Sequence, residues 1–223
     1  MLAAALIASV SGCGESSPTD NGIATRSPAQ ILAAAESAAG RAVSVHVKGS
    51  ILSEGTPISL QMELLPGKGG SGELELGGDH VDLVTLDRLV YVKADERFYR
   101  GVAGAAAARA LGDRWLRARA SVGPFAPLAR LASAGQLIDG TLANHGALTN
   151  AGTTTLDGRP VVAVRDPAHD ATLYVAATGP PYPLEIRVGG AGHSEIVFDR
   201  WNKRVTLTPP TNPIDAEGLQ LAH

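Results

Sequence analysis

The sequence predicts an α+β fold, in which one continuous antiparallel sheet of about ten strands is accompanied by helices in two places. Apolar and polar residues alternate over most of the 223-residue chain, which is the period of strands that bury one face. Short connections rich in glycine and proline separate these strands, as in an antiparallel meander. Two alanine-rich segments with helical periodicity interrupt the series.

The N-terminus predicts export and lipid anchoring. The run from Leu2 to Val10 is apolar but only nine residues long, whereas a membrane-spanning helix needs about 20, so it is typical of a signal peptide. Val10-Ser11-Gly12-Cys13 resembles the bacterial lipobox, which places signal cleavage after residue 12. In lipoproteins with this motif the thiol carries a diacylglyceryl group and the new amino terminus an acyl group such as palmitate, and two chains suffice for stable anchoring.

Cys13 is the only cysteine of the chain. The alternative to lipidation is that Cys13 is an isolated cysteine in the core or on the surface. Residues 13–27 are polar and lack periodicity, which predicts the lipidated cysteine and a flexible tether. Residues 28–223 are expected to form a single domain on the outer face of the cytoplasmic membrane or in the cell envelope. A net charge of −3 gives no electrostatic footprint for nucleic acid.

The first element after the tether is a helix. Ser27, Pro28 and Gln30 form a capping-box pattern, so a helix is predicted from Pro28 to about Ala39, with Gly40 at C′. From Ala42 the period changes to two. The positions that alternate on the expected buried face are Val43, Val45, Val47, Ile58, Leu60, Met62, Leu64, Leu74, Leu76, Val81, Leu83, Val90 and Val92.

Residues 101–143 are rich in alanine and leucine, which predicts two or three short helices with breaks at Pro124 and Pro127. Strands then resume from Ala147, and Asp157-Gly158 predicts a type I′ hairpin. The apolar positions of the later strands are Leu173, Val175, Leu184, Ile186, Val188, Ile196, Phe198, Val205 and Leu207.

Motifs of catalysis are missing from the sequence, so we expect a protein that is not an enzyme and that has no cofactor apart from its acyl anchor. It contains no Gly-x-Ser-x-Gly, Ser-x-x-Lys or Walker-type loop. The glycine-rich residues 67–72 enter a strand and predict a hairpin turn. Asp79, His80 and Asp82 could be drawn as a metal site, but solvated turn polarity is the favoured interpretation.

The chain resembles the LppX/LprG-type (LprAFG) lipoproteins of mycobacteria and their actinobacterial relatives, whose fold is similar to that of LolA. The matching pieces, in order, are "VDLVTLDRLVYVKADERFYRG", "DRWLRA", "TLDGRPVVAVRD", "ATLYVAATGPPYPLEIRV" and "VTLTPPTNPID". The resemblance implies a strongly curved half-barrel sheet covered by helices. It also implies an apolar cavity between sheet and helices that takes the acyl chains of lipids or lipoglycans.

Strand parity then selects the residues that would line such a cavity. These are Val45, Val47, Leu60, Met62, Leu74, Leu83, Leu173 and Ile186, with Trp115, Phe125 and Leu128 at the mouth or lid. The alanine-rich segments 33–39 and 103–110 would leave volume over the sheet, unless the helices simply pack closer to it.

The leading hypothesis is therefore an anchored, monomeric protein that binds or transfers an amphipathic lipid, with an envelope transporter as a candidate partner. The alternative is a scaffold or sensor-accessory lipoprotein that acts through a protein partner, with the sheet filled by its own side chains.

Overall fold

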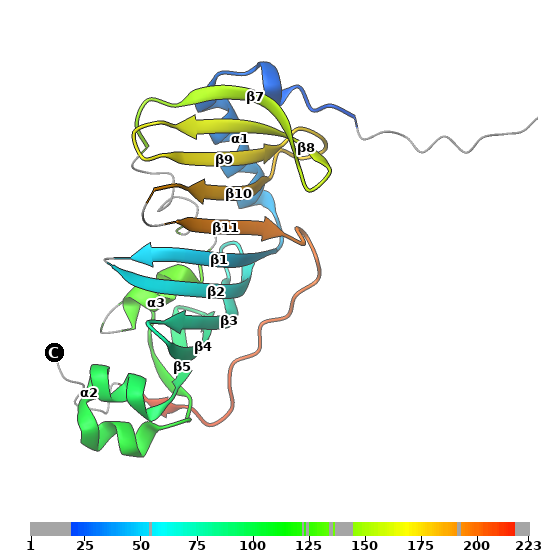
Figure 1. Ribbon diagram of the computed structural model, residues 1–223. Coiled ribbons are helices and arrows are strands. Elements are labelled where there is room, and N and C mark those ends of the chain that lie inside the picture. Colours follow the sequence, from blue (N-terminus) through cyan, green and yellow to red (C-terminus); the bar gives the residue numbers. More distant parts are fainter. Residues whose placement is uncertain are drawn as a thin grey trace, which may run out of the picture.

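In the part of the chain that the structure describes, the fold is a single open sheet of twelve strands with few helices, so the predicted α+β class with one curved antiparallel sheet is confirmed. The computed structural model describes residues 19–216 except 54, 122, 124, 134, 135, 137–144, 191 and 192. Cys13 and the predicted signal peptide lie outside the described residues. The sheet twists strongly along its length (Figure 1).

The strands follow the order β12-β6-β5-β4-β3-β2-β1-β11-β10-β9-β8-β7, and β12–β6 is the parallel pair. Their bounds are β1 Val45–Ser53, β2 Thr56–Leu65, β3 Gly69–Leu76, β4 Asp79–Leu86, β5 Leu89–Ala94, β6 Leu116–Arg119, β7 Thr149–Leu156, β8 Arg159–Asp166, β9 Ala171–Ala176, β10 Pro183–Val188, β11 Ser194–Asp199 and β12 Ile214–Asp215. The helices are η1 Ile23–Thr25, α1 Pro28–Arg41, α2 Glu96–Leu111 and α3 Ala126–Leu131.

Two rows of register partners carry the core across the sheet. The first row is Ala94, Val81, Leu74, Leu60, Gly49, Ile196, Ile186, Leu173 and Val164. The second row is Leu116, Val92, Leu83, Gly72, Met62, Val47 and Phe198. Directly opposed residues point to the same face, so both rows share one side of the sheet, here called the inner face. Its apolar members belong to one buried cluster that includes residues of α1 and α3.

Helix α1 begins as predicted. The Ser27 hydroxyl accepts from the Gln30 N–H at 3.4 Å, and the Gln30 side chain accepts from the Ser27 N–H at 3.1 Å. The helix continues to Arg41, with Ala42 as its C-cap. Gly40 therefore lies inside the helix, and its prediction as C′ is wrong.

The segment before α1 is ordered, although it was expected as the end of the tether. Asp20 bridges Thr178, and the Asn21 side chain donates to the carbonyls of Ala176 and Gly179 at 2.9 Å each. Ile23 is buried in the core. Residues 20–27 thus fasten the chain to the sheet, and the length available as a tether ends near residue 19.

Helix α2 does not lay an alanine surface on the sheet, which corrects the expectation for residues 103–110. Ala105 and Ala106 are exposed, and Gly104 interrupts the helix with a φ of 78°. Among the side chains of α2 that the structure describes, Tyr99, Ala108 and Leu111 are buried, and the helix packs at one end of the sheet rather than over it (Figure 1).

Four further expectations along the chain are wrong. Residues 116–119, expected in a helical region, form β6, and Pro127 lies in the first turn of α3 rather than between helices. Val43 precedes β1 and is 65% exposed. Val205 and Leu207 are not in a strand.

The segment that holds Val205 and Leu207 is an extended connection. It runs from β11 along the sheet to β12 (Figure 1), where Ile214 N–H donates to Trp115 O at 2.8 Å. Pro209 and Pro210 in this connection lack the N–H donors that a ladder needs.

Glycines of the inner face offer a test of this packing. A Cβ on Gly72 would lie 2.1 Å from Gln61 O and 2.7 Å from the Met62 sulfur, whereas a Cβ on Gly40 would meet nothing within 4 Å. We expect Gly72→Ala to lower the free energy of unfolding by about 1–3 kcal/mol. Gly40→Ala should raise it by about 0.5–1 kcal/mol. Urea denaturation of both variants measures the difference, and equal effects would contradict the register.

Candidate functional site

The inner face brings together the sheet residues that strand parity selected. Val45, Val47, Leu60, Met62, Leu74, Leu83, Leu173 and Ile186 all belong to one buried cluster. Direct register pairs join Leu60 to Leu74, Met62 to Val47, and Leu173 to Ile186. The candidate site is therefore a continuous apolar surface that spans most of the sheet.

Two glycines leave the apolar surface without side chains near its middle. Gly49 lies between Leu60 and Ile196 in one row, and Gly72 lies between Met62 and Leu83 in the other. Neither position adds a side chain to the interior. A Cβ on Gly49 would lie 2.0 Å from Glu195 O, so the close approach of neighbouring strands requires glycine there.

An apolar cavity of about 30 Å³ lies beneath α1. Leu173 and Ile186, two of the selected residues, line it together with Leu32, Val164, Leu148, Ala171, Thr172, Asp166 and His145. The volume is well below the roughly 300–1,000 Å³ of small-molecule sites. Sequence patterns did not single out Leu32 or Leu148, because nothing local indicates which helix residue or loop residue meets which strand.

A second, wider hollow of about 480 Å³ lies where the β4–β5 turn, the chain after β6 and α3 meet. It is lined by Arg88, Ala120, Ser121, Ala126, Ala129, Arg130 and Gln136. None of these residues was selected from the sequence, because they come from separate turns and one short helix.

The three residues expected at the mouth differ in burial. Phe125 and Leu128 are buried under α3 within the main cluster. Trp115 is half-buried and precedes β6, whereas α3 follows β6.

Helix α3 is held on the inner face by a polar contact to the sheet. The Thr85 hydroxyl accepts from the Gly70 N–H at 3.0 Å and donates to Ala132 O at 3.5 Å. A side chain on Gly70 would lie 3.0 Å from that same carbonyl. Glycine in β3 thus lets α3 sit close to the sheet.

Asp166, at the edge of the smaller cavity, is a structural carboxylate. Its oxygens accept from the N–H groups of Gly146 at 2.9 Å and Ala168 at 3.1 Å, and lie 2.6 Å from His169 Nδ1. The hydrogen bond from His169, with the two backbone N–H groups, holds the pKa of Asp166 below its usual range. A carboxylate so occupied is poorly suited to act as a general base.

Glu185 is a second buried carboxyl, on the opposite face of the sheet. Burial raises its pKa, and the charge of Arg187 opposes that shift. Arg187 pairs with Glu185 and lies 5.3 Å above the Tyr174 ring. The group is an ion pair packed on an aromatic side chain, which accounts for its burial.

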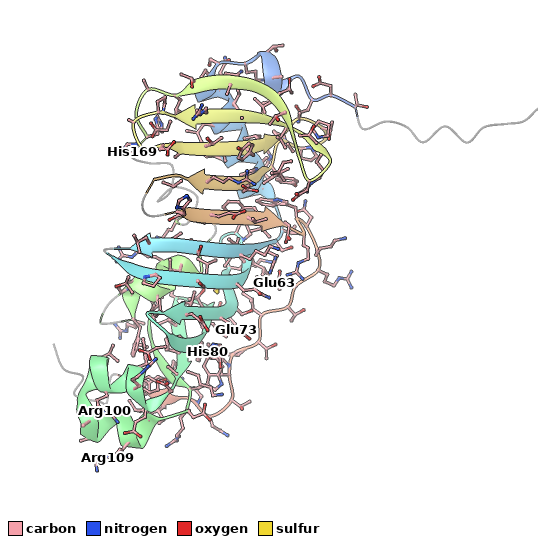
Figure 2. All side chains as sticks on the ribbon, viewed as in Figure 1. Glu63, Glu73, His80, Arg100, Arg109 and His169 are labelled. Atoms are coloured by element: carbon pink, nitrogen blue, oxygen red, sulfur yellow. The ribbon has the colours of Figure 1, made fainter. Side chains whose placement is uncertain are left out.

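His46 and Asp199 pair across β1 and β11, with Nδ1 2.6 Å from Oδ1. Glu63 on β2 binds Arg200 at 2.9 Å beside them, and Figure 2 labels Glu63 on the sheet. Within the described chain, buried His46 Nε2 has no hydrogen-bond partner. Among the described residues, no nucleophile completes this pair as a catalytic triad.

The residues considered as a metal site, Asp79, His80 and Asp82, instead form ordinary surface pairs. His80 Nε2 lies 3.3 Å from Asp82 Oδ1, and Asp79 pairs with Arg97. Among the residues that the structure describes, no group of three or more His, Cys, Asp or Glu side chains is arranged to hold a metal ion. No helix in the described part of the chain is long and apolar enough to cross a membrane.

The fold matches those of two mycobacterial proteins. LprF from Mycobacterium bovis superposes with a TM-score of 0.54 and 16% identity over 82% of this chain and 96% of that chain. The Mycobacterium tuberculosis lipoprotein LppX gives 0.50 and 18% identity over 81% of this chain and 99% of that chain. No family model matches the sequence, and no curated protein matches it. The similarity to the LppX type is confirmed at the level of the fold.

The environment of Asp166 predicts acid sensitivity. A lowered folded-state pKa means that its contribution to stability is complete above the usual Asp value of about 3.9 and is lost as pH falls through the folded pKa. Asp166→Asn should be less stable than the wild type at pH 7, and the difference should shrink on acidification. Chemical denaturation between pH 7 and pH 3 measures it; a constant difference would show that the charge of Asp166 is immaterial.

Proposed function

We propose that the chain is an exported, lipid-anchored and non-enzymatic protein that binds an amphipathic lipid, with the acyl chains between the inner face and the helices. The observation that carries this proposal is the mostly aliphatic inner face, continuous over most of the sheet. Its binding energy would come from apolar area removed from water, at about 25 cal/mol per Å².

The lengths of the helices that cover the inner face, compared with the width of the sheet, support the proposal. Twelve strands at about 4.8 Å spacing span about 50 Å. Helices α1, of 14 residues, and α3, of 6 residues, are about 21 Å and 9 Å long. The part of α1 that is buried ends in the methyl groups of Ala35, Ala38 and Ala39. Among the described residues the helical cover is therefore short and rich in small side chains, and the inner-face residues beneath it are buried, with the cavity of about 30 Å³ under α1.

The small volume of the cavity beneath α1 favours a second candidate, the scaffold or sensor-accessory lipoprotein that works through a protein partner. A core filled by its own side chains needs no ligand. The two candidates differ in whether the protein carries lipid when it is purified.

The decisive experiment is native mass spectrometry, with organic extraction, of the full chain purified from its own membrane. We expect a bound lipid. Ala35→Phe on the buried face of α1 should displace that lipid without unfolding the protein. In a filled core the same change would instead lower stability by about 1–3 kcal/mol.

Ala106→Phe is the matched control, because Ala106 is exposed and the change should alter neither lipid occupancy nor stability. A wild-type protein that is recovered as bare polypeptide, and that takes up no lipid from vesicles of its membrane, would favour the scaffold.

The anchor is tested separately through Cys13. Cys13→Ala should leave an unprocessed or released protein, because the acyl chains have no attachment point. It should unfold at the wild-type denaturant concentration, since the described contacts of the N-terminal segment with the sheet are made by Asp20 and the residues after it. Membrane fractionation and intact mass measure both results. Recovery of the variant as a signal-cleaved, membrane-bound protein would exclude the lipoprotein assignment.

A further inference from the structure

The wider hollow has two arginines at its rim and small alanine side chains at its base. Arg88 and Arg130 are exposed on its rim, and Ala120, Ala126 and Ala129 are half-buried or buried within it. Within the described chain neither guanidinium forms an ion pair. Other arginines of the protein do so, as Arg97, Arg100, Arg117, Arg187 and Arg200 pair with carboxylates.

Arg88 stands at a turn position that favours glycine. Asp87 and Arg88 connect β4 to β5 with φ values of 52° and 65°. The equivalent turn between β7 and β8 uses Asp157 and Gly158, with 47° and 76°. A type I′ turn prefers glycine or asparagine at these positions, and a long side chain in the left-handed region is strained. The strained backbone directs the arginine to the hollow, which suggests a function for its side chain.

We propose that this hollow binds the phosphate-type headgroup of the amphipathic lipid. The inference rests on the proposed lipid-binding function and names the chemical class of its ligand. A guanidinium offers a planar set of donors that matches phosphate oxygens, and Arg88 and Arg130 supply two. Ser121 and Gln136 add polar groups on the same rim.

The alanine floor suits the part of the ligand next to its headgroup. Methyl groups of Ala126 and Ala129 on α3 face the hollow, and the same short helix carries Leu128, which is buried in the apolar cluster. A bound amphiphile could therefore place its phosphate on the arginines and its chains toward the inner face. The volume of about 480 Å³ lies within the range of small-molecule sites.

Three soluble probes test the proposal on the full chain. Dihexanoyl phosphatidylglycerol carries the phosphate and short chains, dihexanoylglycerol lacks the phosphate, and inorganic phosphate lacks the chains. We expect the phosphatidylglycerol to bind most tightly, with an affinity that falls as salt increases. Calorimetric titration at two salt concentrations measures these affinities.

Variants locate the binding. Arg88→Gly creates the Asp-Gly turn that the chain already uses between β7 and β8, so it should fold at least as well as the wild type. Arg88→Gly and Arg130→Gln should each weaken phosphatidylglycerol binding by about tenfold and leave dihexanoylglycerol binding unchanged. Arg159→Gln, which removes the same charge from an exposed position on β8, is the matched control and should have no effect.

The outcomes separate this inference from the proposed function. Equal affinity for the two lipids, or an equal loss with Arg159→Gln, would overturn the headgroup site while lipid binding stands. Inorganic phosphate binding as tightly as the phosphatidylglycerol would assign the arginines to a free anion. Binding to phosphatidylglycerol vesicles but not to the soluble lipid would make the arginines a membrane contact, which also overturns the proposal. Failure to bind any lipid would overturn the proposed function itself.

Discussion

Cross-strand pairing of apolar side chains over the inner face is the interaction on which the rest of the structure depends. A slip of one residue in any antiparallel pair would turn that strand over and expose its buried residues. The register that aligns Leu60 with Leu74 also aligns Gly49 and Gly72 with larger neighbours. Those glycines permit close approach of adjacent strands, so pairing, curvature and a thinned interior arise from one arrangement.

Local patterns were sufficient to predict much of the fold. The capping box at Ser27 and the Asp157-Gly158 hairpin are set by residues close in sequence, and alternation assigned most inward positions. Contacts between distant segments were beyond such patterns. The pairing of Ile214 with Leu116 joins residues about a hundred positions apart. The Asp87-Arg88 turn has no glycine to indicate its type, and sequence patterns gave Arg88 no chemical role.

The candidate site was likewise predictable where local patterns decide it, and not where distant segments meet. Period two places Val47, Met62 and Leu173 on one face, which is why the sheet residues meet in one cluster. Whether a cover leaves space depends on helix position, and Ala106 illustrates this, because composition suggested a covering methyl where the side chain is exposed. Arg88 and Arg130 converge only after a turn and a short helix are placed in three dimensions.

If the chain is anchored through Cys13 as proposed, the two ends of the sheet take different roles. The chain enters beside β9, where Asn21 is fastened, and the arginine hollow adjoins β5, seven inter-strand steps away. At about 4.8 Å per step this is about 35 Å along the sheet, whereas the seven residues from Cys13 to residue 19 reach at most about 25 Å. A molecule standing upright on its anchor would therefore hold the hollow away from its own membrane. Under the proposed function, lipid would be received or delivered at that distal end, and the apolar inner face between the ends would shield its chains from water.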